Sequence, residues 1–202
     1  MRLFEHPHDY RAFLQIVAEA QGRVPVRCLS YCVMPNHFHF VLWPREDGDL
    51  SRFMFWLTTT HSMRWNVWHG TSGTGHVYQG RFKAFPMQQD THFLRVCRYV
   101  ERNALRAALV PRAEAWPWSS LAQRCGTKLP IDLTDWPVPR PDSWLEDIQI
   151  DPATETQEVR TALRRSAPYG PEQWQERIVV QLGLRKSLRP TGRPWNITTT
   201  LG

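Results

Sequence analysis

The sequence lacks any run of about 18 consecutive apolar residues, and its start has no basic segment followed by an apolar one. A membrane-spanning helix and an export signal are therefore not expected, which favours a soluble, cytoplasmic protein. Cysteine is scarce, and no Cys-x-x-Cys pair is present. Cys28 and Cys32 would lie too far apart on one strand to bridge, so we expect Cys28, Cys32, Cys97 and Cys125 to be reduced core residues. The chain also has no internal repeat and no low-complexity run.

Apolar and aromatic residues are plentiful. They make up 42% and 12% of the 202 residues, which is enough for a core and argues against wholesale disorder. The net charge of +6 favours a polyanionic partner. Basic side chains predominate in residues 1–125 and again from Arg160 onward, whereas residues 126–158 carry eight acidic side chains and two basic ones. An ordinary solvated surface would give the same totals, so charge alone does not decide between such a surface and one that binds a polyanion.

The most informative stretch is Cys32-Val33-Met34-Pro35-Asn36-His37-Phe38-His39-Phe40-Val41-Leu42-Trp43. It predicts a β-hairpin with a strand over 24–34, a tight turn at Pro35 and Asn36, and a second strand over 37–43. Because side chains alternate along a strand, His37 and His39 share one face, and the apolar residues between and after them share the other. Two neutral imidazoles so close together suit a divalent metal ion. Two ordinary strand histidines would give the same pattern.

Other segments have clear periodicities. Apolar spacing predicts helices over 8–21, 50–68 and 91–108, the last of them capped by Asp90. Alternation predicts a third strand over 77–87. Four prolines between 130 and 141 indicate an extended connector. The tail has helical spacing over 154–166 and 172–182 and ends in a basic segment over 184–194.

The helix predicted over 91–108 has one apolar face and one polar face. At about 100° per residue, Tyr99 and Asn103 lie about 40° apart on the polar face, among Arg95, Arg102 and Arg106. Clustered guanidinium groups suit phosphate, because each planar fork binds two oxygens. A tyrosine there can stack on a base, form a hydrogen bond or act as a nucleophile, or it can be an ordinary surface residue. Glu101 falls toward the core side, where Arg81 is a candidate partner.

Together these segments resemble the HUH nucleases, and more closely the REP-associated tyrosine transposases. The His-x-His hairpin is similar to that of the family, and Val77-Tyr78-Gln79-Gly80-Arg81-Phe82 is similar to its strand before the catalytic helix. Residues 98–107 are similar to its Tyr-Ile-x-x-Asn-Pro-Val-Arg-Ala signature, with Ala104-Leu105 in place of Pro-Val. Two more family blocks resemble Trp116-Pro117-Trp118-Ser119-Ser120 and Tyr169-Gly170-Pro171-Glu172-Gln173-Trp174. Five ordered blocks are more specific than any single motif.

The resemblance implies an α+β, ferredoxin-like or RRM-like HUH domain with an antiparallel sheet, helices on one face and a mostly helical C-terminal tail. It implies a catalytic domain over 1–125, a Pro-rich acidic connector over 126–158 and a basic tail over 159–202. Since the family's first strand has no counterpart in this sequence, an upstream start or a truncated, inactive copy is expected.

The resemblance also implies the chemistry. Tyr99 would be the nucleophile that forms a 5′-phosphotyrosine, and His37, His39 and Asn103 would be ligands of Mg²⁺ or Mn²⁺. The substrate would be single-stranded DNA with REP-type hairpin repeats, bound by a monomer or a homodimer. Eight basic residues are expected to contact this DNA: Arg81, Arg95, Arg102, Arg106, Arg185, Lys186, Arg189 and Arg193.

Two other functions stay open. One is a module that binds hairpins without cutting them, because an RRM-like sheet stacks single strands on aromatic side chains. The other is a metal-dependent hydrolase that acts through activated water and leaves no covalent adduct. The tail, which has Trp174 and Trp195 near its basic residues, is expected either to fold back on the catalytic domain and regulate access or to grip the hairpin stem.

Overall fold

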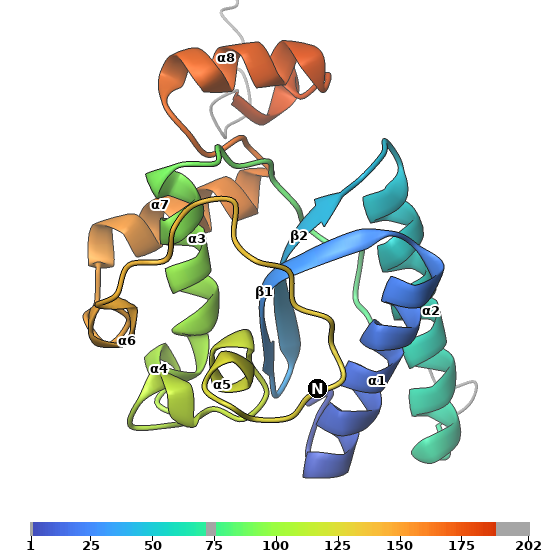
Figure 1. Cartoon of the computed structure of the whole chain (residues 1–202). Coiled ribbons are helices and arrows are strands. Elements are labelled where there is room, and N and C mark those ends of the chain that lie inside the picture. Colours follow the sequence, from blue (N-terminus) through green and yellow to red (C-terminus); the bar gives the residue numbers. More distant parts are fainter. Residues whose placement is uncertain (1, 72–75, 189–202) are drawn as a thin grey trace, which may run out of the picture.

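A β-hairpin lies at the centre of the computed structural model, which describes residues 2–71 and 76–188 (Figure 1). Strand β1 (Val26–Met34) pairs antiparallel with β2 (His37–Pro44), and Met34 lies opposite His37 across the turn. The predicted hairpin is therefore confirmed. Within the described residues the sheet consists of these two strands.

Helices surround the hairpin. They are α1 (Pro7–Arg23), α2 (Asp49–Trp68), α3 (Thr91–Glu101), α4 (Asn103–Arg106), α5 (Ser120–Arg124), α6 (Trp144–Asp147), α7 (Ala153–Arg165) and α8 (Glu172–Gln181), with 3-10 helices η1 (Ala113–Ala115) and η2 (Arg185–Leu188). The predicted helices that correspond to α1, α2, α7 and α8 are confirmed. The helix predicted over 91–108 is interrupted at Arg102, between α3 and α4. In the part of the chain that the structure describes, no helix has the length and apolar character needed to span a membrane.

Side-chain caps set the starts of two helices. Asp9, in the first turn of α1, accepts hydrogen bonds from the backbone N–H groups of Glu5 and His6 at 2.9 and 2.8 Å. Asp90 accepts one from the backbone N–H of His92 at 2.8 Å, which confirms the predicted N-cap of α3. Asp90 satisfies a donor that the first turn of α3 leaves without a partner, whereas Asp9 binds the chain just before α1. The second cap fixes the start of the helix that carries Tyr99.

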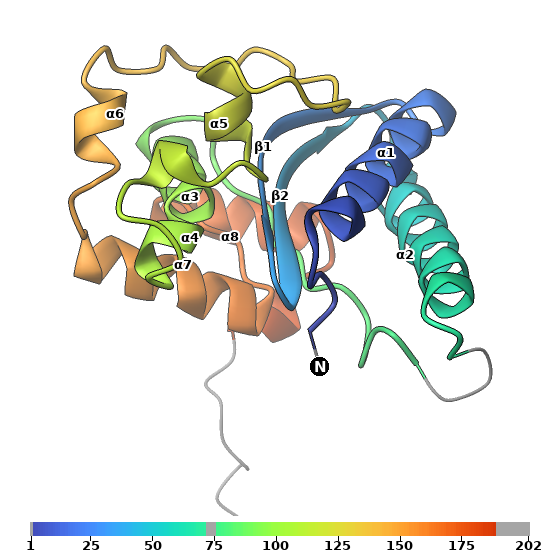
Figure 2. The same ribbon diagram turned by 90° about the horizontal axis from the view of Figure 1, so that it is seen from below.

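Helices cover both faces of the hairpin, so the prediction of helices on one face is wrong (Figure 2). Helices α1 and α2 pack on the face that carries Phe38 and Phe40. Helix α3 packs on the opposite face, where Cys32 and Val41 contribute to a second core. The cause lies in β1, in which every residue except Arg27 is buried. A strand that is apolar on both faces needs cover on both.

Residues 77–87 do not form the predicted third strand. In the described chain they make one isolated bridge, between Met87 and Tyr169. Gly80 interrupts the alternation of this segment, and residues 79–83 are exposed. The ends of the segment are nevertheless held, because Tyr78 Oη lies 2.6 Å from His61 Nδ1 and the Met87 bridge ties the other end to Tyr169. The segment crosses from α2 on one face of the hairpin to α3 on the other (Figures 1 and 2).

The chain after α5 contacts both sides of the hairpin: Ile131 packs in the core with α1, whereas residues from 136 to 169 contribute to the core on the α3 side. Trp144 of α6 is buried, and its indole N–H donates to Glu101 Oε2 at 2.9 Å. The hydroxyls of Ser120 and Ser30 lie 2.6 and 3.3 Å from Glu101 Oε1. Burial raises the pKa of Glu101. These three donors, rather than the predicted Arg81, are the partners of Glu101.

Candidate active site

The two histidines of the hairpin lie together at the start of β2. The ring centroids of His37 and His39 are 4.8 Å apart, and the rings are nearly perpendicular. Phe38 points to the opposite face, where its ring centroid lies 5.0 Å from that of Phe13 in α1. The alternation read from the sequence therefore holds, and it places both imidazoles on the face that α3 covers.

Tyr99 reaches the histidines from α3. Its ring centroid lies 5.6 Å from that of His39, with the rings at 80°. The sequence placed Tyr99 on an exposed helical face, but only 8% of its surface is accessible. It is covered because Pro152, Glu155 and Thr156 line the same small pocket as Tyr99. A helical wheel cannot show this cover, because the covering residues come from a segment more than 50 positions later.

Arg106 connects Tyr99 to Asn103. Its guanidinium carbon lies 4.4 Å from the centroid of the Tyr99 ring, a cation–π arrangement. Its Nη2 also donates a hydrogen bond to Asn103 Oδ1. Asn103 is the first residue of α4 and is buried, and its Nδ2 has no partner within the described residues. The tyrosine and the amide, predicted to share a face, are thus joined through one arginine.

The electrostatics of the site keep both imidazoles neutral near pH 7. Burial lowers the pKa of His39 to about 3, and the nearby His37 and Arg106 act in the same direction. Burial also lowers the pKa of His37, again with a contribution from Arg106. Neutral imidazoles can donate a lone pair to a metal ion, whereas imidazolium cannot.

The donor set fits a divalent metal ion. His37 Nδ1 lies 2.7 Å from Asn36 Oδ1, and because an amide oxygen only accepts, Nδ1 carries the proton and Nε2 keeps its lone pair. Among the described residues no three His, Cys, Asp or Glu side chains form a group that could hold a metal ion. A ligand set would therefore need the amide oxygen of Asn103, or oxygens of the substrate, in addition to His37 and His39.

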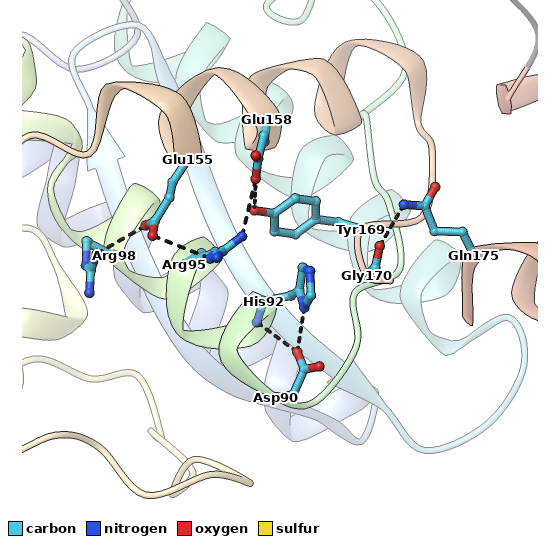
Figure 3. A network of polar contacts seen from close by, with 9 residues as sticks. All are labelled: Asp90, His92, Arg95, Arg98, Glu155, Glu158, Tyr169, Gly170 and Gln175. Atoms are coloured by element: carbon cyan, nitrogen blue, oxygen red, sulfur yellow. Dashed lines mark hydrogen bonds and ion pairs between the residues drawn. The ribbon is translucent and has the colours of Figure 1, made fainter. Parts of the chain in front are cut away.

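Three arginines of α3 and its C-cap are paired with carboxylates of residues 151–158. Arg95 lies 3.4 Å from both Glu155 and Glu158, and Arg98 lies 3.1 Å from Glu155 (Figure 3). Arg102 lies 3.1 Å from Asp151. We call Asp151, Glu155 and Glu158 the carboxylate row. Of the three arginines expected to face phosphate, Arg95 and Arg102 are therefore paired with carboxylates, which are themselves phosphate-like acceptors, whereas Arg106 contacts Asn103 and Tyr99.

The remaining predicted DNA contacts are distributed differently. Arg81 is exposed in the segment between α2 and α3, and Arg185 is exposed in η2. The side chain of Lys186 and all of Arg189, Arg193 and Trp195 lie outside the described residues. Among those of the eight whose side chains the structure describes, Arg106 contacts both Tyr99 and Asn103.

Sequence reasoning missed Arg98 and the carboxylate row. The signal was present, since the acidic stretch over 126–158 follows a basic catalytic region. The sequence predicts this stretch as an acidic connector and not as a partner for arginines. Periodicity gives the face of a helix but not the element that packs on it.

In a comparison with protein-family models, residues 2–103 match the family described as "Transposase IS200 like". The matched range contains the two histidines, Tyr99 and Asn103, and it ends before Arg106 and the carboxylate row. Comparison with curated proteins and with solved structures gave no match.

Proposed function

Because the chain belongs to the IS200-like transposase family, we propose that it cuts and rejoins single-stranded DNA at REP-type hairpin repeats through Tyr99. Membership implies transposase-type DNA chemistry. The hairpin substrate and the roles of individual residues are part of the proposal. The observation that carries it is the position of the Tyr99 ring 5.6 Å from the ring of His39 and under the Arg106 guanidinium.

The reaction follows from these groups. Tyr99 Oη attacks the scissile phosphorus, a bond forms between Oη and phosphorus, and the bond from phosphorus to the 3′ oxygen breaks. The products are a 5′-phosphotyrosine and a free 3′-hydroxyl, and a 3′-hydroxyl can reverse the step to join strands. Arg106, 4.4 Å above the Tyr99 ring, would stabilise the negative charge that develops on the phosphate oxygens.

His37, His39 and Asn103 would hold Mg²⁺ or Mn²⁺. The chemistry that such an ion supplies is polarisation of the scissile phosphate. Asn103 keeps one lone pair of Oδ1 available, because an amide oxygen has two and Arg106 takes one. The neutral state of His37 and His39, which their lowered pKa values favour, suits this role.

Arg95 and Arg102 would bind DNA only when the carboxylate row releases them. Phosphates would reach these arginines only by displacing Glu155, Glu158 and Asp151. Arg81 is exposed and could contact DNA directly. Arg185, Lys186, Arg189 and Arg193 would grip the hairpin stem.

We also propose the domain organisation. Residues 1–125 would form the ferredoxin-like HUH domain, residues 126–158 the connector and residues 159–202 the tail. Support for the first unit comes from the hairpin with helices that precede and follow it. Helix α7 runs across the proposed boundary between the connector and the tail, and its Glu155 pairs with Arg98 of α3. The site residues all come from one chain, so a monomer would contain a whole site, and a homodimer would contain two.

A hairpin-binding protein without nuclease activity is the second candidate. It is favoured by the cover over Tyr99 and by the pairing of the arginines with carboxylates. A hairpin oligonucleotide from the genome that encodes the chain, labelled on both sides of the hairpin, separates the two. Mn²⁺-dependent nicking that is lost in Tyr99→Phe and His39→Ala supports the transposase. Tight binding with no nicking at any metal concentration supports the binding protein.

A further inference from the structure

Glu101 is the last residue of α3, and it is buried. Tyr99 precedes it by two residues and Asn103 follows it by two. Residues two apart on a helix lie about 200° apart, so Glu101 points away from the face that carries Tyr99 and Asn103. Whatever holds the Glu101 side chain in place therefore also fixes the direction in which the tyrosine and the amide point.

Both oxygens of the Glu101 carboxylate accept hydrogen bonds from other elements. Oε1 lies 2.6 Å from the Ser120 hydroxyl and 3.3 Å from the Ser30 hydroxyl, and Oε2 accepts the indole N–H of Trp144 at 2.9 Å. These donors come from α5, β1 and α6. A buried carboxylate that loses its donors is strongly destabilising, so these bonds favour one arrangement of α3 against the other three elements.

The contact with Ser30 links Glu101 to the strand that lies beside His39. Ser30 and Cys32 are two residues apart on β1, and Cys32 lies opposite His39 in the hairpin. Tyr99, two residues before Glu101, contacts the His39 ring. The Ser30 bond and the Tyr99 ring contact therefore join α3 to the hairpin at two neighbouring places. Because packed elements transmit strain, a shift at one place changes the other.

Ser120 is itself fixed to β1. Its hydroxyl accepts the backbone N–H of Tyr31 at 3.0 Å and donates to Glu101. The residue before it, Ser119, forms a β-bridge with Cys32. A continuous path of hydrogen bonds thus runs from the backbone of the hairpin to the end of the helix that carries the tyrosine.

Trp144 brings a distant part of the chain to the same carboxylate. It lies in the segment proposed as a connector, after residues 2–103, which match the family. Only 2% of its surface is accessible, and its ring centroid lies 5.7 Å from the guanidinium carbon of Arg98. The segment over 126–158 therefore does more than join two parts of the chain, because it supplies a buried donor to the helix that carries Tyr99.

We propose that Glu101 is a positioning residue, which sets the place of Tyr99 relative to His39 and is held by its three donors. The inference rests on the proposed function, because it takes Tyr99 as the nucleophile. Glu101 does not touch the reacting atoms and acts through the backbone of α3. Displacing a reacting group by about 1 Å can lower a rate by about a hundredfold, so a small shift of α3 has a measurable effect.

The kinetic test measures covalent adduct formation in a single turnover at saturating hairpin oligonucleotide with Mn²⁺, together with the dissociation constant. Trp144→Phe removes the indole donor and keeps an aromatic ring. Glu101→Gln keeps the shape of the side chain, and it carries the test should Trp144→Phe not fold. We expect each variant to form the adduct about tenfold more slowly and to bind DNA within about twofold of wild type. Wild-type rates in both variants overturn the proposal.

Trp116→Phe is the matched control for a loss of stability. It too removes one indole donor from the interior, but that donor bonds to the backbone carbonyl of Val33 at 2.9 Å. Urea unfolding identifies conditions in which every variant is folded, and the rates are compared there. Trp116→Phe should react within about twofold of wild type. An equal loss of rate in Trp116→Phe and Trp144→Phe would be a general effect of destabilisation and would contradict the role of Glu101.

The position of Tyr99 can also be measured without catalysis, by NMR of the metal-free protein. The Tyr99 ring lies 5.6 Å from the His39 ring at an angle of 80°, so its ring current contributes to the chemical shifts of the His39 ring protons. In Trp144→Phe and Glu101→Gln these shifts should move toward those of Tyr99→Leu, which has no ring current at this position. In Trp116→Phe they should stay as in wild type.

Failure of this proposal and failure of the proposed function are distinguishable. If wild type forms no adduct, the proposed chemistry is wrong, while displaced His39 shifts in Trp144→Phe and Glu101→Gln still support the positioning role. If wild type forms the adduct and those two variants keep both its rate and its His39 shifts, the chemistry stands and the positioning role is wrong. Slow adduct formation with unchanged His39 shifts also contradicts positioning.

Discussion

The guanidinium of Arg106 lies over the ring of Tyr99, 4.4 Å from its centroid, while one of its nitrogens donates to Asn103. One cation therefore contacts both of the side chains that the polar helix face was expected to present. It also contributes to the lowered pKa values of His37 and His39. Arg106 is the group through which the tyrosine, the amide and the histidines affect one another.

Replacing Arg106 should remove the charge that stabilises the phosphate and the hydrogen bond that positions Asn103. We expect Arg106→Ala to reduce single-turnover cleavage by about a hundredfold, the scale seen when one donor to a developing oxyanion is removed. Arg106→Lys should recover part of the loss, since lysine keeps the charge but not the planar fork. In NMR titrations the pKa values of His37 and His39 should rise in Arg106→Ala. Arg11→Ala, at an exposed position on α1, is the control. Wild-type cleavage by Arg106→Ala would rule out this role.

Removing the carboxylate row should strengthen DNA binding. In Glu155→Gln/Glu158→Gln, Arg95 and Arg98 lose their partners and become available to phosphate. We expect affinity for single-stranded DNA to rise about tenfold at low salt, as charge-assisted hydrogen bonds form with phosphate. Because these ion pairs are partly exposed, the loss of folding stability should be about 0.5 kcal/mol per pair.

The matched control is Glu172→Gln/Glu176→Gln. It removes the same two charges from exposed positions on α8. If both double variants bind DNA with the same increase in affinity, the effect is one of net charge, and the carboxylates do not compete with phosphate.

His61 should make stability depend on pH. Burial lowers the pKa of His61 to about 4, whereas an unfolded histidine has a pKa near 6.5. As pH falls through 6.5, His61 binds a proton in the unfolded state but not in the folded state. The stabilisation is therefore complete above about pH 6.5 and is lost progressively toward pH 4, by about 3 kcal/mol in total.

His61→Gln tests this dependence, because glutamine keeps an acceptor for the Tyr78 hydroxyl and does not titrate. Urea unfolding from pH 8 to pH 4 should show wild type losing stability faster than the variant as pH falls. Parallel curves for the two proteins would show that His61 is not the titrating group.

The hairpin, and the position of His37 and His39 on one face of it, were predictable because strand alternation is local. Capping by Asp90 was also predictable, since the cap and the N–H that it binds are two residues apart. The irregular backbone of residues 77–87 was not predictable, because Gly80 disrupts a weak alternation. The burial of Tyr99 was not predictable either, because α7 comes from a distant part of the chain. Glu101 was placed correctly near the core, but its partners Ser30, Ser120 and Trp144 come from three separate elements.

The basic tail should contribute salt-dependent affinity. Substitution of the basic residues tests this better than truncation at residue 160, because truncation would remove Ala162 and Tyr169 from the core. Replacing Arg185, Lys186, Arg189 and Arg193 with glutamine should lower the slope of log affinity against log salt for a duplex stem by about 0.9 per lost contact. Discrimination of bases in the single-stranded foot should not change, because backbone contacts position the protein and do not specify sequence. An unchanged slope would mean that the tail is a solvated terminus.

The most direct test of the central claim is the identity of the atom that attacks phosphorus. Wild-type protein is incubated with a hairpin oligonucleotide and Mn²⁺ in ¹⁸O-water, digested and analysed by mass spectrometry. Nucleophilic attack by Tyr99 predicts a nucleotide attached to the peptide that contains Tyr99, no such adduct in Tyr99→Phe, and a released strand that ends in a 3′-hydroxyl. A cleaved strand with ¹⁸O in its 5′-phosphate and no modified peptide would identify water as the nucleophile and contradict the account.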